Sequence, residues 1–279
     1  MGSIPLTAIV LTHNEAVNIQ GCLDALHQVD DVVLLDSGST DDTLSLAAQS
    51  RSDLRVYSHP FRDFGDQRNW ALDHTHPRHP WVLFVDADEV CTSDLLEEIR
   101  RFIAHPGDCV GAYVAGRNYF LGTWLRYSTF YPSFQLRLLK LGQVRYRKEG
   151  HGQREITEGP LHYLHQFWHH DGFSHGVADW IARHNRYSSD ETELIQRLRA
   201  EPVNWRGLLS RDPIQKRRAI KILAAKAPFR PITRFLYTYV YRRGFLDGTP
   251  GLMYCLLRFA HELHIIVKLE ERRAVGRQP

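Results

Sequence analysis

The chain has few of the residues that cross-link small secreted proteins. Only four of its 279 residues are cysteines, and no two of them form a C-x-x-C pair: Cys22, Cys91, Cys109 and Cys255. Neither a disulfide framework nor a cysteine-based zinc site is therefore expected, and the composition favours a reducing compartment.

Long apolar runs are missing as well. The segment "IPLTAIVLT" near the start of the sequence lacks the basic region and long apolar stretch of a signal peptide, so we expect none. Charged residues and histidines interrupt the apolar stretch "GLMYCLLRFAHELHIIVKL", so it does not qualify as a transmembrane helix. With 43% apolar and 24% charged residues, the chain has the composition of a globular protein, and we expect a cytoplasmic location.

Two common cofactor signatures are also absent. No G-x-G-x-x-G follows the first expected strand, which disfavours a dinucleotide-binding domain of the Rossmann type. No H-E-x-x-H is present and no cysteine pairs with the histidine cluster at residues 162–175, which disfavours zinc there.

Charge is divided unevenly along the chain. Residues 1–139 hold 10 Lys and Arg against 18 Asp and Glu, a net charge of −8. Residues 140–279 hold 25 against 14, a net charge of +11. One interpretation is that the charges lie unevenly on a solvated surface. The other is that the second half binds an anionic partner, such as nucleic acid, phosphorylated lipid or a membrane surface.

The first hundred residues alternate between short apolar runs and segments with helical spacing. The expected strands are residues 4–11, 32–35, 54–59 and 81–85, and the expected helices between and after them begin near residues 17, 43, 65 and 93. This alternation predicts an α/β fold, with a mostly parallel central sheet and helices on both of its faces.

The pattern changes after about residue 110. Two strand-like segments, a His-rich segment and then four helical segments follow: 175–200, 213–226, 230–243 and 251–271. We predict one α/β domain over residues 1–165, in two parts at 1–105 and 106–165. A helical basic region over 166–279 follows it.

Polar motifs follow three of the expected strands directly. "LTHNEAVNI" places Thr12, Asn14 and Glu15 after the first strand, and "DSGSTDDT" places Asp36 and Ser37 after the second. Ligands of parallel sheets bind at the carboxyl ends of the strands, so these side chains are candidate ligand contacts. Helix capping and tight turns are the alternative explanation.

The third motif, "WVLFVDADEV", ends an apolar strand in three acids. Such a cluster needs a metal ion, a basic side chain or bulk water. Asp86 and Asp88 lie two residues apart and can meet one ion, and carboxylates with substrate phosphates suit Mg²⁺ or Mn²⁺. We expect Glu89 to cap or brace the helix that follows. A solvated acidic loop is the alternative.

In this order and spacing, the three motifs resemble those of family-2 glycosyltransferases with the GT-A fold. "THNE" resembles the first nucleotide-contacting loop of that family, "DSGSTD" the second, and "DADE" its D-x-D metal motif. One departure is Ser37, where many members carry a second acid. The later segments "YPSFQLRLL" and "HHDGFSHG" resemble the branch that includes lipopolysaccharide-core and exopolysaccharide glucosyltransferases.

The resemblance implies that residues 1–165 are a catalytic domain, with a nucleotide-sugar part at 1–105 and an acceptor part at 106–165. It also implies how a donor would be held. The segments around Thr12, Asn14 and Glu15, and around Asp36 and Ser37, would contact the nucleotide of a donor such as a UDP-sugar. Asp86 and Asp88 would engage the ribose and a divalent cation that bridges the diphosphate. Arg68 is a candidate phosphate-binding cation, although a surface position on an amphipathic helix explains it nearly as well.

An inverting transfer also needs a carboxylate base for the acceptor hydroxyl. Glu155 and Glu149 are the candidates, with Glu155 preferred by the resemblance and Asp171 as an outside choice. A salt bridge to a neighbouring Arg or Lys is the alternative role for either Glu. The resemblance also makes His169 or His170 a candidate metal ligand, although packing is the commoner role of such histidines.

The segment from Arg211 to Arg243 holds ten Lys and Arg, interleaved with aromatic residues. This pattern is typical of helices on a membrane surface, and a glycolipid or lipid-linked saccharide acceptor would explain it. We therefore expect a peripheral protein on the inner face of the cytoplasmic membrane, and no nucleic-acid partner. The alternatives are a nucleotidyltransferase and a non-catalytic membrane- or nucleic-acid-binding protein of the same fold.

Overall fold

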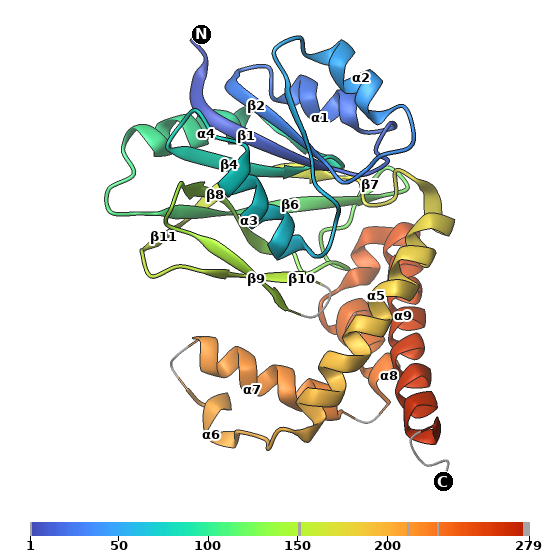
Figure 1. Ribbon diagram of the computed structural model, residues 1–279. Coiled ribbons are helices and arrows are strands. Elements are labelled where there is room, and N and C mark those ends of the chain that lie inside the picture. The colour runs from blue at the N-terminus through green and yellow to red at the C-terminus, as the bar shows by residue number, and fades with distance from the viewer. Residues whose placement is uncertain (1, 150–151, 211–212, 228, 276–279) are drawn as a thin grey trace. The chain divides into compact units, whose positions relative to one another are not determined.

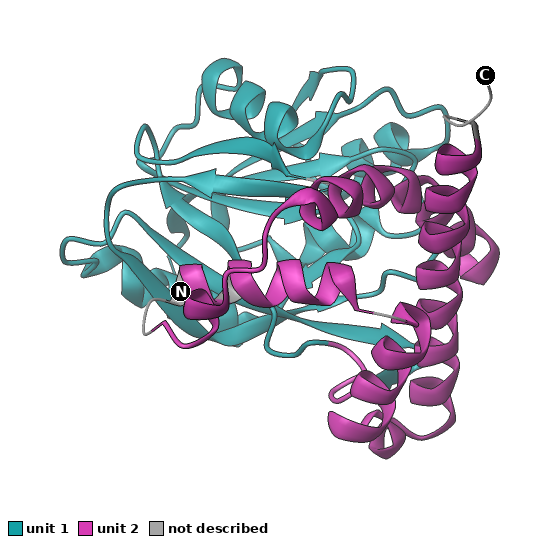
Figure 2. Cartoon of the chain, turned by 90° about the horizontal axis from the view of Figure 1, so that it is seen from below, with its two compact units in different colours: residues 1–124, 130–175 teal, residues 125–129, 176–279 magenta. Residues whose placement is uncertain are grey.

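The computed structural model describes residues 2–149, 152–210, 213–227 and 229–275. The chain forms two compact units (Figure 2). Unit 1 comprises residues 1–124 and 130–175, and unit 2 comprises residues 125–129 and 176–279. The expected boundary after residue 165 falls inside a strand of unit 1.

The first half of the unit 1 sheet is parallel, as the alternating pattern predicted. Its strands lie in the order β3 (Arg55–Ser58), β2 (Val29–Asp36), β1 (Ile4–Thr12) and β4 (Trp81–Asp86). The connecting helices are α1 (Ile19–Ala25), α2 (Thr43–Ser50) and α3 (Phe64–His74). Register pairs Thr12 with Asp36 and Leu11 with Asp86, so the polar motifs after β1, β2 and β4 meet at one edge of the sheet (Figure 1).

The second half of the sheet is mixed. Beyond β4 come β8 (Phe134–Lys140), β6 (Gly111–Phe120), β11 (Leu161–His170) and the short β5 (Glu89–Cys91), and β7 (Thr123–Trp124) pairs with β6. β8 is antiparallel to both neighbours, β6 and β11 are parallel, and β5 is antiparallel to β11. The His-rich segment therefore belongs to the sheet, which continues to His170.

Two layers of side chains cover the sheet, because residues along each strand point alternately to its two faces. One face of β1, with Leu6, Ala8 and Val10, packs against α1, α2 and α4 (Ser93–Ala104). The other face, with Ile9, packs towards α3. Each fully buried aliphatic side chain contributes about 1.5–3 kcal/mol, so these layers fix the sheet and its ends. The predicted α/β fold with helices on both faces is confirmed (Figure 1).

A small two-stranded sheet lies beyond α3. β9 (Arg145–Glu149) and β10 (Gly152–Ile156) pair antiparallel, and Asn69 of α3 bonds both backbone groups of Tyr146 through its side-chain amide. The β9–β10 hairpin is thereby held against α3.

Unit 2 is helical. Its elements are α5 (Gly176–Ala200), α6 (Trp205–Leu208), α7 (Pro213–Lys226), α8 (Arg230–Phe235), η1 (Leu236–Tyr241), η2 (Gly244–Asp247) and α9 (Gly248–Val275). Aliphatic side chains of α5, α7 and α9 form its core: Ile195, Leu198, Ile222, Ala225, Ile265 and Leu269. No helix among the described residues has the length and apolar character needed to cross a bilayer.

The helix expected at 230–243 is interrupted. After α8 the chain widens into the π-helical turn η1, where the Thr238 hydroxyl donates to the carbonyl of Arg234. Arg243 then adopts a left-handed φ of 62°, which ends the helix. Arg211, the expected start of the basic segment, lies outside the described residues.

A buried carboxylate explains why residues 125–129 belong to unit 2. Asp247, only 7% exposed, accepts hydrogen bonds from the backbone N–H groups of Arg126, Tyr127 and Ser128 and from the Ser128 hydroxyl. Leaving such a carboxylate without donors would be costly, so the segment is fixed to η2.

Candidate active site

The loop after β1 is built on a left-handed residue. Asn14 has a φ of 56°, a conformation that asparagine tolerates better than most residues. Its backbone N–H donates to Ser39 Oγ at 2.8 Å, and its Oδ1 accepts from the Thr40 N–H at 2.7 Å. The first two predicted motifs therefore interlock. Thr12 Oγ1 is buried at the end of β1 and has no hydrogen-bond partner in the described structure.

Glu15 joins this loop to the end of the His-rich segment. Its Oε2 lies 3.0 Å from His175 Nε2 and accepts a 2.6 Å bond from Asn18 Nδ2. Asn18 also donates to Ser174 Oγ at 2.7 Å. No local pattern reveals these contacts, because their partners lie about half the chain apart.

Asp36 organises its own turn. It is 3% exposed, and its carboxylate accepts bonds from the N–H groups of Gly38 and Ser39, both at 2.9 Å. Gly38 has a φ of 90°, which side-chain-bearing residues rarely adopt. Ser37 Oγ accepts a bond from Gln67 Nε2 at 2.9 Å. The Asp36 carboxylate therefore shapes the turn. Capping of the following helix, the alternative explanation of this motif, does not require Asp36.

Basic side chains meet the acids that follow β4. Asp86 Oδ1 lies 3.0 Å from Arg68 Nη2, and its Oδ2 lies 2.7 Å from Arg137 Nη2. Both arginine side chains are 2% exposed. Burial alone would raise the pKa of Asp86, but Arg137 and Arg68 together hold it well below its ordinary value. The alternative of Arg68 as a surface side chain is wrong.

Glu89 completes a buried charge cluster. Its Oε1 lies 2.6 Å from Arg137 Nη2, and its Oε2 accepts the backbone N–H of Asp86 at 2.9 Å. Burial raises the pKa of this carboxyl, while Arg137 favours its charged form. The expectation that Glu89 caps the next helix is wrong, because the Thr92 side chain caps α4 by accepting from the Leu95 N–H. Glu89 instead fixes Arg137 and the backbone of the acidic loop.

Asp88 has a histidine partner. Its Oδ2 lies 3.2 Å from His170 Nε2, while His170 Nδ1 lies 2.8 Å from Asn118 Oδ1. Pairing of β11 with β5 sets His170 opposite Glu89 and so brings it to the loop. Burial alone would lower the pKa of His170, but Asp88 raises it to about 9.

His169, the other candidate ligand, points to the opposite face of β11. Its ring contacts those of Tyr119 and Phe167, and burial lowers its pKa. The structure therefore does not bring it to Asp88.

The donor atoms present fit a divalent cation that is shared with a ligand. No group of three or more His, Cys, Asp and Glu side chains within the described ranges is arranged to hold a metal by itself. Both oxygens of Asp86 face arginines, which leaves Asp88 and His170 as the available protein ligands. One carboxylate and one imidazole, completed by phosphate oxygens, suit Mg²⁺ or Mn²⁺.

The two candidate bases occupy different surroundings. Glu155 Oε1 accepts a 2.6 Å bond from the Tyr113 hydroxyl. Two residues earlier on the same face of β10, Gln153 Oε1 accepts from Arg68, the partner of Asp86. Glu149 lies 3.6 Å from Arg154, in the salt bridge named as its alternative role. Asp171, the outside choice, is exposed, and its backbone N–H donates to the Asp88 carbonyl at 3.3 Å.

Arg137 is the site residue that sequence reasoning missed. The signal was an arginine inside the apolar strand segment "FQLRLL", where a buried charge needs a partner. The partners themselves are far away in the chain, and only the pairing of β4 with β8 brings them together.

A family model now assigns the chain. The model described as glycosyl transferase family 2 matches residues 7–166, more than half of the chain. The chain belongs to glycosyl transferase family 2. Its matched segment contains most of β1, all of β2 to β10, most of β11 and the acidic loop, so the expected family is confirmed.

A solved structure agrees on the fold. The mannosyltransferase PcManGT from Pyrobaculum calidifontis, determined in complex with GDP-Man and Mn²⁺, is similar with a TM-score of 0.50 at 18% identity. The similarity covers 95% of this chain and 86% of that one. The GT-A fold expected for the family 2 chain is therefore confirmed.

Curated relatives carry glycosyltransferase names. The lipopolysaccharide core biosynthesis glycosyltransferase LpsC of Rhizobium meliloti (strain 1021) is 32% identical over 147 residues, 51% of this chain and 53% of LpsC. The SPbeta prophage-derived glycosyltransferase SunS of Bacillus subtilis (strain 168) is 24% identical over 224 residues, 74% of this chain and 49% of SunS. The match thus spans about half the length of these relatives.

Proposed function

We propose that this chain transfers a hexose such as glucose from a UDP-sugar to a lipopolysaccharide-core or lipid-linked saccharide acceptor, with inversion at the sugar. The observation that carries the proposal is the cluster at the carboxyl edge of the sheet. There Asp88 and His170 lie together beside an Asp86 carboxylate that two buried arginines hold in place. Ligands of parallel sheets bind at this edge.

The side chains have distinct roles in this proposal. Asp88 and His170 hold a Mg²⁺ or Mn²⁺ ion, which when bound supplies positive charge to the diphosphate leaving group. The interlocked loops around Asn14 and Asp36 provide a rigid wall for the nucleotide. Rigid placement matters, because positioning supplies much of the rate of a group transfer.

Glu155 is the proposed base. The Tyr113 hydroxyl fixes its carboxylate at 2.6 Å, on the same face of β10 as Gln153. A carboxylate positioned in this way can accept the proton of an acceptor hydroxyl as the new glycosidic bond forms.

The acceptor part of the proposal rests on two observations. The name of the relative LpsC includes lipopolysaccharide core biosynthesis. In unit 2, residues 229–246 form an apolar segment that exposes eight large side chains: Phe229, Ile232, Leu236, Tyr237, Val240, Tyr241, Phe245 and Leu246. Arg242 and Arg243 lie among them. Exposed aromatic and aliphatic side chains with nearby arginines suit the surface of an anionic membrane.

The test is sugar transfer or hydrolysis with a panel of UDP- and GDP-sugars in the presence of Mn²⁺. We expect turnover with at least one UDP-sugar and its loss in Asp88→Ala. Asp108→Ala is the control, because Asp108 is exposed and outside the cluster. Equal turnover in wild type and Asp88→Ala, or no turnover with any donor, would count against the proposal.

A further inference from the structure

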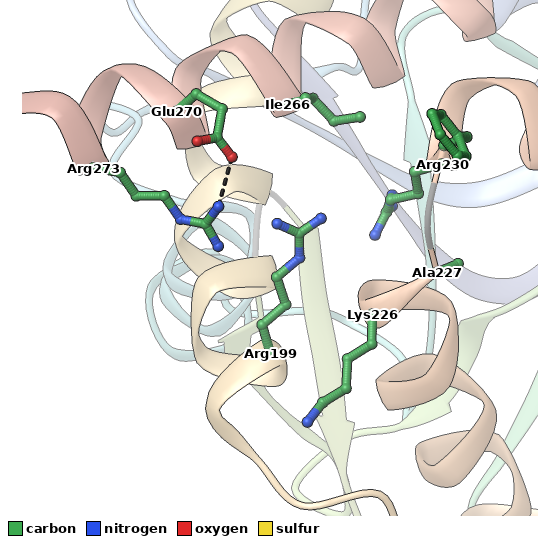
Figure 3. A pocket seen from close by; sticks show the side chains of 8 residues that line it. Arg199, Lys226, Ala227, Arg230, Ile266, Glu270 and Arg273 are labelled. Atoms are coloured by element: carbon green, nitrogen blue, oxygen red, sulfur yellow. Dashed lines mark hydrogen bonds and ion pairs between the residues drawn. The ribbon is translucent and has the colours of Figure 1, made fainter.

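Unit 2 contains a basic hollow that the proposed transfer reaction does not use. The hollow has a volume of about 550 Å³ and is open to solvent. Four basic side chains line it, each from a different helix: Arg199 of α5, Lys226 of α7, Arg230 of α8 and Arg273 of α9. In Figure 3 the guanidinium groups of Arg273, Arg199 and Arg230 lie in a row across it.

Two of the guanidinium groups are held in place by other groups. Arg199 Nε donates to the Ala225 carbonyl at 2.8 Å, which directs its two terminal nitrogens into the hollow. Arg230 makes two bonds to Glu262, whose side chain is 5% exposed, at 2.7 and 3.3 Å. Donors fixed before a ligand arrives lose little entropy when it binds.

The positive charge of the hollow is only partly balanced. Glu262 pairs with Arg230, and Glu270 pairs with Arg273 at 2.6 Å. Arg199 and Lys226 form no ion pair with any residue that the structure describes. Burial lowers the pKa of Arg199, and the nearby charges of Arg273 and Arg230 lower it further. The cluster therefore repels itself, and a bound anion would relieve this repulsion.

We propose that this hollow binds a phosphate or diphosphate group, carried either by a soluble metabolite or by a lipid headgroup. Planar guanidinium groups fit the oxygens of phosphate in pairs, and lysine adds a mobile point charge. The volume exceeds the needs of a bare phosphate. Ile266 and Phe229 line the same hollow, so the rest of the bound molecule would meet apolar side chains.

The proposal is tested by isothermal titration of wild type with inorganic phosphate and with pyrophosphate, both in the presence of a metal chelator. Co-sedimentation with phosphatidylcholine vesicles that contain phosphatidic acid tests the lipid source. We expect Lys226→Gln/Arg273→Gln to bind at least about tenfold more weakly than wild type, because it removes two charged donors.

The matched control is Lys216→Gln/Arg272→Gln. It removes the same charge from the same two helices but from side chains outside the hollow. The control should bind like wild type. Binding of the soluble anions points to a metabolite, and binding of the vesicles alone points to a headgroup. No binding of either probe by wild type, or equal weakening in both double variants, overturns the proposal.

Both double variants keep Arg199 and Arg230 and their structural contacts, so we expect both to fold. Circular dichroism of each variant checks this. Arg199→Lys gives a third variant that keeps the charge. It should still weaken binding, since an ammonium group cannot reproduce the paired geometry. Full retention of affinity in Lys226→Gln/Arg273→Gln and in Arg199→Lys contradicts a site built from these side chains.

Discussion

Among single residues, Arg137 contacts two of the three acids that follow the apolar part of β4. One of its nitrogens contacts both Asp86 and Glu89, at 2.7 and 2.6 Å. Burying three acids beside an apolar strand is unfavourable unless opposite charges accompany them. Arg137, with Arg68 and His170, supplies those charges within the described structure.

Replacing Arg137 by leucine should destabilise the protein by roughly 3–5 kcal/mol, because it leaves Glu89 buried without its partner. The double variant Arg137→Leu/Glu89→Leu should be more stable than the single variant, since it removes the unpaired charge as well. Urea denaturation followed by circular dichroism measures both free energies of unfolding. A double variant at least as unstable as Arg137→Leu would show that the pair is not the source of the loss.

Glu155→Gln should lower kcat by roughly 100- to 10,000-fold, the usual contribution of a positioned base. It keeps the size of the side chain and a hydrogen-bond acceptor for Tyr113. Glu149→Gln, on the same hairpin, is the control and should retain most of the activity. Steady-state kinetics measures kcat for both variants. A larger loss of kcat in Glu149→Gln than in Glu155→Gln would assign the role of base to Glu149 instead.

The sequence predicted some of these residues better than others. Asp86, Asp88 and Asp36 follow apolar strands directly, so their place at the sheet edge could be predicted from local pattern alone. The choice between His169 and His170 could not, because adjacent strand residues point to opposite faces. Only the pairing of β11 with β5 shows which of them faces the acidic loop.

Among the elements, the boundaries of α5 and α7 match the helical spacing of the sequence, while the segment after α8 does not. Apolar spacing near 3.6 residues continues through 230–243, and it predicts one helix. The π-helical turn and the left-handed Arg243 depend on tertiary contacts such as those of Asp247, which spacing does not reveal.

His261 of α9 should make unit 2 sensitive to acid. Burial, followed by the neighbouring charges of Arg258 and His184, lowers its pKa to about 3, while Glu191 opposes them. Unfolding returns this pKa to about 6.5. The unfolded state thus binds more protons between these values, so the stability from the neutral ring is present above about pH 6.5 and lost as pH falls.

At pH 5 this difference amounts to roughly 2 kcal/mol. His261→Gln should therefore lose less stability than wild type between about pH 7.5 and about pH 5. Urea denaturation at each pH measures the free energy of unfolding of both proteins. Parallel pH profiles of the two proteins would assign the acid sensitivity to other groups.

For the whole molecule, the uneven charge of the sequence has a structural counterpart. The acidic first half supplies the strand-end cluster of unit 1, and the basic second half supplies the hollow of unit 2. Net charge left a solvated surface and an anionic partner open, and it indicated no place of contact. The proposed place, the hollow, depends on which helices bring Arg199, Lys226, Arg230 and Arg273 together.

Membrane contact through the apolar segment 229–246 predicts a defined mutational effect. Tyr241→Ser should weaken binding to vesicles of phosphatidylcholine and phosphatidylglycerol by roughly tenfold, since it removes one large apolar side chain from the bilayer. Val267→Ser, at a similarly exposed position of α9, is the control. Co-sedimentation measures both, and an unchanged affinity of Tyr241→Ser would remove this segment from the proposal.

The most direct test of the account is the effect of Mn²⁺ on UDP binding, measured by isothermal titration with wild type, Asp88→Asn and the control Asp108→Asn. If Asp88 and His170 hold a cation that meets the diphosphate, wild type and the control should bind UDP at least about tenfold more tightly with Mn²⁺ than with a chelator. Asp88→Asn should lose this difference. Equal UDP affinity with and without Mn²⁺ in wild type, or an undiminished Mn²⁺ effect in Asp88→Asn, would contradict the account.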